Sequence, residues 1–413
     1  MAPLDFVALQ NTRDCQYAFA RSLIEAKEDI VAFVHKRLEW NGTGSYNGFL
    51  KGSFNISFKV QRDDSDEQVI IRFPIPGKLY EPWRDEKVEN EVIVMKYLYD
   101  LTSIPVPVVR DWGLTKDSPQ HLGLSIIMDF VEGRSSSRPG YRQYKARLRL
   151  RADSRLYAGT ITSPFATHRL YLPEHNFCLN SAVPFDCASH FFAARGKSFQ
   201  VHLEAQRNIA TDDEELAWKE FVARRCFAHI IPTHGTVNEA GLFRLFCDDL
   251  RPTNMLVDLE TLRIIAVLDF EFTNAMPAQF AEDVPWWLLL QQPAVWIGGG
   301  KLQEFLTLFQ PRKEQFIRAM ERAEAKSQLA TEGISLSARM RDSWDSGRFW
   351  FNLASRSSFD ISEIYWGVLH KDGLGEALLD SAIMREKEAF LQRKKAQFDA
   401  YRREKQSDPR FAD

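Results

Sequence analysis

Residues Phe243–Asp258, FRLFCDDLRPTNMLVD, and Leu268–Glu271, LDFE, decide the fold of this chain. In the longer stretch, Asp249 and Asn254 stand five positions apart, with Pro252 between them. Because proline interrupts a regular helix, this stretch is expected to be a loop. A loop of this length can turn a carboxylate and an amide toward one cavity.

Asp269 supplies a second carboxylate to the same place. It lies 20 positions after Asp249 and follows the apolar run Leu262–Leu268, which is expected to return as a strand. Two carboxylates and the amide oxygen of Asn254 form an oxygen-only set, which suits Mg²⁺ shared with phosphate oxygens rather than zinc. Each residue alone could be an ordinary turn or capping residue. Their order along the chain favours a kinase-type site.

The sequence resembles the aminoglycoside phosphotransferase and choline-kinase branch of the protein-kinase-like phosphotransferases, in particular its fungal members. The resemblance covers Phe243–Leu290 and the strings GSFNISFKV, VIIRFP, ENEVIVMKYL, IPVPVV and SWDSGRFWFNLASRSSFDISEIYW, and it omits Arg134–Asn176. It implies an α+β, bilobal kinase-like fold, with a small antiparallel-sheet N-lobe that carries one helix and a larger, mainly helical C-lobe. It also implies ATP and Mg²⁺ as cofactors.

The resemblance implies a role for each polar residue of the loop and the turn. Asp249 would orient the acceptor hydroxyl and take its proton. Arg251 would contact the γ-phosphate, and a surface salt bridge is the alternative reading. Asn254 and Asp269 would hold Mg²⁺, and Glu271 would either assist the metal or hold the loop.

The nucleotide half of the site is expected in the first lobe. Gly52, Ser53 and Phe54 stand at the head of a strand, where backbone N–H groups can bind phosphate oxygens; a plain hairpin turn is the alternative. Arg72 lies among apolar strand residues and needs a partner, for which Glu91 on the following helix is the candidate. This pair would position the α- and β-phosphates.

A hinge is expected where an apolar strand ends at Asp129–Glu132. Its backbone would bind adenine, with Met128 and Phe130 lining the base pocket. The full set of hinge residues assigned to the nucleotide is Met128, Asp129, Phe130 and Val131. Ordinary core packing is equally compatible with this composition.

Two departures from the family pattern keep a second function open. Arg72 stands where relatives usually carry lysine, and arginine keeps the charge but not the geometry. Cys247 stands where the loop usually carries histidine. These two residues motivate the alternative of a pseudokinase, a nucleotide-binding or scaffolding module without phosphate transfer. The turn with its single glycine, Gly52, and the basic stretch 134–155 point the same way.

The short segment that follows the turn at Asp269 argues against a protein kinase. Only 13 positions separate Phe270 from Asp283, which matches a carboxylate that braces the catalytic loop in relatives. The strings D-F-G and A-P-E are also missing from this segment. Little room is left for a peptide-binding platform, so the acceptor is expected to be a small molecule of unknown identity.

Length and composition limit the possible domain organisation, partners and compartment of the chain. The 413 residues exceed one compact core, and we predict an N-terminal helical extension (1–40), a nucleotide-binding lobe (41–131) and a helical lobe (132–413) with a basic irregular insert at 134–176. A net charge of −3 argues against nucleic acid or an anionic membrane as partner. Five cysteines without a CxxC pair, no secretory signal and no apolar span predict a cytoplasmic protein. The oligomeric state stays open.

Hydrophobic periodicity and turn residues predict the secondary structure. A capping box at Thr211 is expected to open one of the helices. The expected helices are 14–40, 86–101, 185–204, 211–230, 301–309, 313–328 and 376–404, and the expected strands are 54–60, 68–73, 104–109 at an edge, 122–131, 255–257 and 267–270.

Overall fold

Contacts between residues divide the chain into two compact units. The computed structural model describes residues 5–77, 84–135, 169–170, 179–180, 185–209, 213–236, 243–326, 333–370 and 381–411. One unit, called here the sheet unit, contains Gln10–Leu156 and Cys247–Thr273. The other, called the helical unit, contains Met1–Leu9, Tyr157–Phe246 and Asn274–Asp413. The three-part division at 40 and 131 stays a prediction, and most of the basic insert lies outside the described residues.

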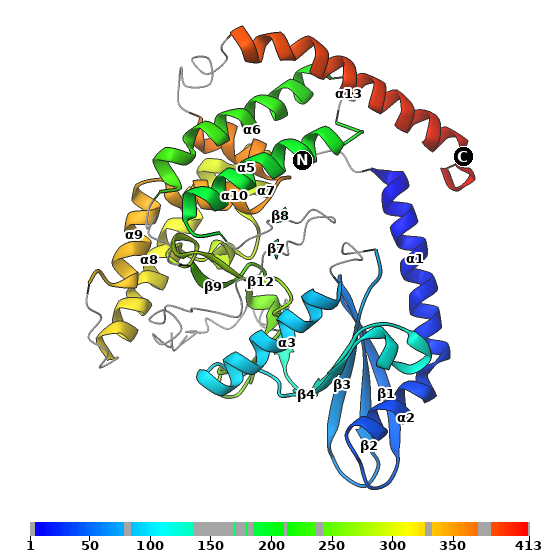
Figure 1. Cartoon of the computed structure of the whole chain (residues 1–413). Helices are drawn as coiled ribbons and strands as arrows, with labels where there is room; N and C mark the ends of the chain where they lie inside the picture. Colours follow the sequence, from blue (N-terminus) through cyan, green and yellow to red (C-terminus); the bar gives the residue numbers. More distant parts are fainter. Residues whose placement is uncertain are drawn as a thin grey trace. The chain divides into compact units, whose positions relative to one another are not determined.

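A five-stranded antiparallel sheet forms the centre of the sheet unit, with the strand order β1-β2-β3-β5-β4 (Figure 1). The strands are β1 (Gly44–Lys51), β2 (Asn55–Arg62), β3 (Gln68–Pro74), β4 (Val109–Gly113) and β5 (Ser125–Asp129). The predicted hairpin is present as β2 and β3, which pair from Asn55↔Pro74 to Gln61↔Gln68. Strand β1 has no counterpart among the predictions.

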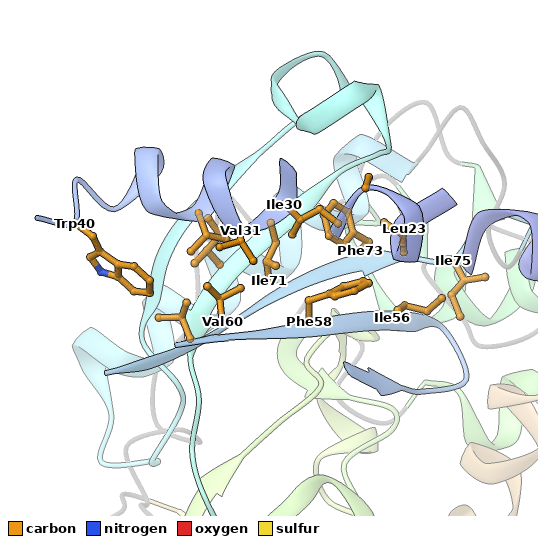
Figure 2. Close-up of a cluster of buried hydrophobic side chains, with 14 residues drawn as sticks. Leu23, Ile30, Val31, Trp40, Ile56, Phe58, Val60, Ile71, Phe73 and Ile75 are labelled. Carbon is orange, nitrogen blue, oxygen red and sulfur yellow. The ribbon is translucent and has the colours of Figure 1, made fainter. Parts of the chain in front are cut away.

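Helices α1 (Phe6–Glu25) and α2 (Lys27–Arg37) supply apolar side chains to one face of this sheet (Figure 2). Ile30 and Val34 of α2 are fully buried in one cluster with Phe58, Ile71 and Phe73 of the strands. Burying side chains of this size contributes about 1.5–3 kcal/mol each. The cluster therefore fixes which face of each strand points away from it.

Helix α3 (Arg84–Leu101) contacts strands β4 and β5 and carries an unusual buried face. Lys87, Asn90 and Glu91 are all at most 5% exposed, in the same helix as the buried Val88 and Val92. Lys and Glu are almost never fully buried unless they are paired. The helix therefore meets a polar site as well as an apolar core.

The short strands of the loop region form a separate sheet within the sheet unit. Strand β10 (Met255–Val257) pairs with β11 (Ile264–Val267) on one side and with the backbone of β6 (Arg134–Ser135) on the other. Asp258 closes the β10–β11 turn, because its Oδ1 accepts the N–H groups of Glu260 and Thr261. This is the local hydrogen bonding that makes aspartate a turn residue.

The helical unit consists mainly of α-helices (Figure 1). A cluster of ring contacts joins Phe305, Phe309, Trp344, Phe349 and Trp350. The helices are α5 (Ala188–Ala205), α6 (Glu214–His234), α7 (Pro293–Gly298), α8 (Leu302–Lys326), α9 (Leu336–Asp345), α10 (Arg348–Arg356), α11 (Ile361–Ile364) and α13 (Ser381–Ser407), and the short strands are β7 (Arg169–Leu170), β8 (Leu179–Asn180), β9 (Phe243–Cys247) and β12 (Thr273–Pro277). With the sheet, these helices confirm the predicted α+β class.

Buried cations satisfy backbone carbonyl groups at the ends of these helices. Lys394 of α13 is 0% exposed and donates to the carbonyls of Leu203, Glu204 and Gln206 at the end of α5. Arg195 donates in the same way to the last carbonyls of α10. The last four carbonyls of a helix have no partner within it, so these side chains close the helix ends.

Several predicted boundaries are wrong: the helix expected at 14–40 is two helices, α1 and α2, and the strand expected at 267–270 is β11, which ends at Val267. The edge strand expected at 104–109 begins only at Val109, because Pro105 and Pro107 cannot donate to a ladder. The helices expected at 301–309 and 313–328 are one helix, α8, with Pro311 inside it. The cap of α6 is Asp213, which accepts from the N–H of Leu216. Thr211 lies outside the described residues, as does the start of the helix expected at 376.

No helix among the described residues has the length and apolar character needed to cross a membrane.

Replacing Lys394 with methionine is expected to destabilise the helical unit. The substitution keeps the apolar stem but leaves buried carbonyls without a donor, at about 1–3 kcal/mol for each unsatisfied group. Urea denaturation should show a loss of about 2 kcal/mol or more in the free energy of unfolding. Lys395→Met is the matched control, because the neighbouring Lys395 side chain is 70% exposed. Equal stability of the two variants would contradict the capping role.

Candidate active site

The β10–β11 hairpin brings Asn254 and Asp269 to one place. Met255 pairs with Val267, and the N–H of Leu268 donates to the carbonyl of Asn254 at 2.8 Å. Asn254 therefore lies just before one strand of the hairpin and Asp269 just after the other. Asp269 has a φ of 68°, a left-handed conformation that is uncommon for any residue but glycine. Such strained backbone clusters at functional sites.

Asp249 is held by its two loop neighbours. The amide nitrogen of Asn254 donates to the Asp249 carbonyl at 2.9 Å and to its Oδ2 at 3.1 Å. The Nε of Arg251 lies 2.9 Å from the Asp249 Oδ1. Because the side-chain nitrogen of Asn254 makes both bonds, its side-chain oxygen is the atom that could bind a cation. Burial raises the pKa of Asp249 above its usual value, and Arg251 and Asn254 only partly oppose this.

Arg72 connects helix α3 with the turn after β11. Its neighbours Ile71 and Phe73 point into the apolar cluster, so alternation along β3 places Arg72 on the opposite face. There its Nη2 pairs with Glu91, the partner expected from the sequence, and its Nη1 lies 3.7 Å from the Asp269 Oδ1. Burial alone would lower the pKa of Arg72, but the nearby carboxylates, above all that of Glu91, together outweigh burial and raise the pKa of Arg72.

Both carboxylate oxygens of Glu271 are engaged. Oε1 accepts from the Asn55 amide at 2.9 Å, and Oε2 pairs with the ammonium of Lys87. Glu271 is only 1% exposed. Although burial opposes ionisation, Lys87 and Arg72 hold the pKa of Glu271 below its usual value. Of the two roles expected for Glu271, this bonding favours holding the loop over binding the metal.

The charges of this cluster leave room for a cation. Two cations, Arg72 and Lys87, stand against three carboxylates, those of Glu91, Asp269 and Glu271. Burial and the neighbouring Glu271 raise the pKa of Asp269 well above its usual value. The Asp269 Oδ1 is buried and accepts no hydrogen bond. A divalent cation at Asp269 would compensate the excess negative charge, so the residues present fit Mg²⁺.

Cys247 serves the packing of the loop. Its thiol lies 3.9 Å from the carbonyl oxygen of Asp269. Burial raises the pKa of Cys247 to about 12, and the nearby aspartates add to the shift. The residue therefore stays protonated, and a thiolate nucleophile is excluded at neutral pH. The small Cys247 side chain therefore fills a packing position in the loop.

The expected phosphate turn joins β1 to β2. The N–H of Gly52 donates to the carbonyl of Asn55 at 2.8 Å, and Gly52 and Ser53 are exposed. The ring of Phe54 packs edge-on against Phe272 at a centroid distance of 5.0 Å. This contact places the turn beside the metal-binding segment. The binding of phosphate by the turn itself stays a prediction.

The expected hinge residues are bonded to the sheet. The backbone N–H groups of Asp129 and Phe130 donate to the carbonyls of Val108 and Gln68. Met128 is 7% exposed, while Asp129, Phe130 and Val131 are partly exposed. The Lys59 ammonium lies 3.9 Å from the centre of the Phe130 ring. Adenine binding at this segment stays a prediction.

Sequence reasoning missed three residues of the site, namely Lys87, Asn90 and Asn55. Lys87 lies one helical turn before Glu91, a spacing that places both on one face of α3. That spacing was the available signal for Lys87. Asn90 donates to the carbonyl of Thr273 at 2.9 Å. No local pattern points to Asn90 or Asn55, because their partners lie more than 180 residues away along the chain.

The sequence matches the profile of the phosphotransferase enzyme family over residues 53–298, more than half of the chain. The chain belongs to this family. The family predicted from the sequence is thereby confirmed. A curated relative in this comparison is the clavilactone A biosynthesis cluster protein Y of Ampulloclitocybe clavipes, 26% identical over 272 residues. The match covers 58% of this chain and 63%, under two thirds, of the relative.

Solved structures of similar fold include a putative aminoglycoside phosphotransferase from Ralstonia eutropha, with 14% identity, a TM-score of 0.43, and 91% of this chain and 98% of the other covered. Another is an ethanolamine kinase from Plasmodium vivax, with 12% identity, a TM-score of 0.42, and coverage of 89% and 83%.

Asp283, the residue expected to brace the loop, has its described partners in the helical unit. Its Oδ1 accepts from the Ser343 hydroxyl at 2.5 Å and from the Asn352 amide at 3.0 Å. Burial raises the pKa of Asp283 from 3.8 to about 7, and these hydrogen bonds only partly oppose the shift. The bracing role stays a prediction.

The stability of the chain is expected to depend on the protonation of Asp283. Between pH 3.8 and about 7 the folded carboxyl keeps a proton that the unfolded one has lost. Stability from this residue therefore falls as pH rises through this window, by up to about 1.4 kcal/mol per pH unit. Urea denaturation at pH 5 and pH 8 should show wild type losing stability relative to Asp283→Asn. A pH-independent difference between the two proteins would contradict the shifted pKa.

Proposed function

We propose that this chain transfers the γ-phosphate of ATP to a hydroxyl or amine of a small molecule, with Mg²⁺ as its metal. The observation that carries the proposal is the grouping of Asp249, Asn254 and Asp269 at one end of the β10–β11 hairpin. This order of loop, hairpin and acidic turn is the catalytic arrangement of kinase-like phosphotransferases.

Asp249 is the residue for the acceptor. A carboxylate whose pKa is raised by burial is a better proton acceptor than a solvent-exposed one. It can hold the acceptor hydroxyl in line with the phosphate and take its proton as the new bond forms. The Arg251 side chain is 41% exposed and reaches the same carboxylate. Its guanidinium can bind two oxygens of the transferred phosphate.

Asn254 and Asp269 would hold Mg²⁺, which when bound neutralises charge on the phosphate oxygens. Arg72, held by Glu91, would contact the α- and β-phosphates. The backbone of Gly52–Phe54 would also contact the phosphates, and Met128–Val131 would bind the adenine. The acceptor is an unidentified small molecule, and the cytoplasm is the proposed compartment.

The pseudokinase alternative shares this nucleotide site but lacks the transfer step. It was raised by Arg72 and Cys247, which depart from the family pattern. In the structure, Arg72 forms the ion pair with Glu91 that the family's lysine would form. The bonding therefore supports an intact site over a degraded one, and activity measurements separate the two functions.

Wild type incubated with Mg-ATP and a panel of hydroxylated and amino metabolites should produce ADP with one class of acceptor. Asp249→Asn should reduce the rate by about 10²–10⁴-fold, because it removes the proton acceptor. The matched control is Glu260→Gln, an exposed acidic residue of the β10–β11 turn, which should keep the wild-type rate. Equal rates for wild type and Asp249→Asn would exclude the role of Asp249.

Mg²⁺ should add to the thermal stabilisation that ADP gives. Asp269→Asn should remove the Mg²⁺-dependent part of this shift in melting temperature, because it removes the charged metal ligand. Differential scanning fluorimetry with ADP and EDTA, then with ADP and Mg²⁺, measures both parts. A metal-dependent shift without turnover of any acceptor would favour the pseudokinase, and an unchanged shift in Asp269→Asn would exclude this metal site.

A further inference from the structure

Helix α3 is tied to three alternate residues of the metal-binding segment. Asn90 donates to the Thr273 carbonyl, and Glu91 holds Arg72, which approaches Asp269. Lys87 pairs with Glu271, which lies between positions 269 and 273. Positions 269, 271 and 273 are thus each connected to one face of one helix.

The Lys87–Glu271 pair is the most deeply buried of these connections. The side chains of Lys87 and Glu271 are 3% and 1% exposed, whereas that of Asp269 is 31% exposed. The Lys87 ammonium also lies 4.9 Å from the centre of the Phe272 ring. A buried ion pair loses much of its stabilisation to desolvation, so its presence asks for a reason beyond stability.

We propose that Lys87 is a positioning residue: it neutralises Glu271 and occupies one of its oxygens, so that Asp269 is the only carboxylate of the turn that binds Mg²⁺. This inference rests on the proposed function. Asn55 occupies the other oxygen of Glu271, so the phosphate turn is joined to the same carboxylate. Glu271 therefore connects the turn after β11 with helix α3, through Lys87, and with strand β2, through Asn55.

The charge arrangement gives opposite predictions for the two partners. Lys87→Met leaves an uncompensated negative charge beside Asp269, which should attract Mg²⁺ more strongly. Glu271→Gln removes one of the three carboxylates and leaves Lys87 without its partner, which should weaken the attraction for Mg²⁺. The double variant Lys87→Met/Glu271→Gln removes both charges and should return to the wild-type metal dependence. A merely structural pair would lower stability in both single variants without this reversal of sign.

The experiment titrates Mg²⁺ into each protein in the presence of ADP and records the melting temperature. The Mg²⁺ concentration for half-maximal stabilisation should fall about tenfold or more in Lys87→Met and rise by a similar factor in Glu271→Gln. Lys87→Arg keeps the charge and should stay within about threefold of wild type. The control is Lys96→Met, an exposed lysine of the same helix, which should titrate as wild type.

Melting temperatures without ADP and Mg²⁺ report folding separately from metal binding. If Lys87→Met does not fold, the rise in Glu271→Gln and its reversal in the double variant still decide the question. Single variants that bind Mg²⁺ as wild type does would overturn the role of Lys87 while leaving the proposed function intact. A wild-type protein without any Mg²⁺-dependent shift would overturn the proposed function itself, and this inference with it.

Discussion

A cluster of two cations and three carboxylates, all but Asp269 buried, holds the functional segments of the sheet unit in place. Arg72 pairs with Glu91 and approaches Asp269, and Lys87 pairs with Glu271. Charges removed from water need partners, so strand β3, helix α3 and the turn after β11 cannot move independently. One negative charge remains uncompensated in this cluster. The same interactions that position the turn therefore prepare it for a divalent cation.

The apolar core makes this polar cluster possible. Helix α2 covers one face of the sheet and draws Ile71 and Phe73 toward it (Figure 2). With the period of two along a strand, Arg72 must then lie on the other face. The hydrophobic effect selects the face, and the ion pairs fix the geometry on it. A purely apolar β3 would pack as well but would leave Glu91 without its cation.

In the helical unit, buried cationic side chains are paired with backbone carbonyl groups. Arg224 is 1% exposed and donates to the carbonyls of Phe199, Glu220 and Ser358. Lys394 does the same at the end of α5. Long cationic side chains thus satisfy buried carbonyl groups both inside helices, as Arg224 does, and at a helix end, as Lys394 does. Their stabilisation comes from satisfied carbonyls, since an unsatisfied buried acceptor costs more than an average hydrogen bond contributes.

By itself, the sequence determined the β2–β3 hairpin, the loop around Pro252 and the grouping of Asp249, Asn254 and Asp269, because turn residues and short-range spacing encode them. The ion pair of Arg72 was also predictable, since an arginine inside an apolar strand demands a carboxylate. Only the tertiary structure decided which side chains the carboxylate oxygens of Glu271 bind. The engagement of both Glu271 oxygens depends on Asn55 and Lys87, which are distant along the chain. Such contacts follow from side-chain direction and from the left-handed turn at position 269, which residue spacing does not specify.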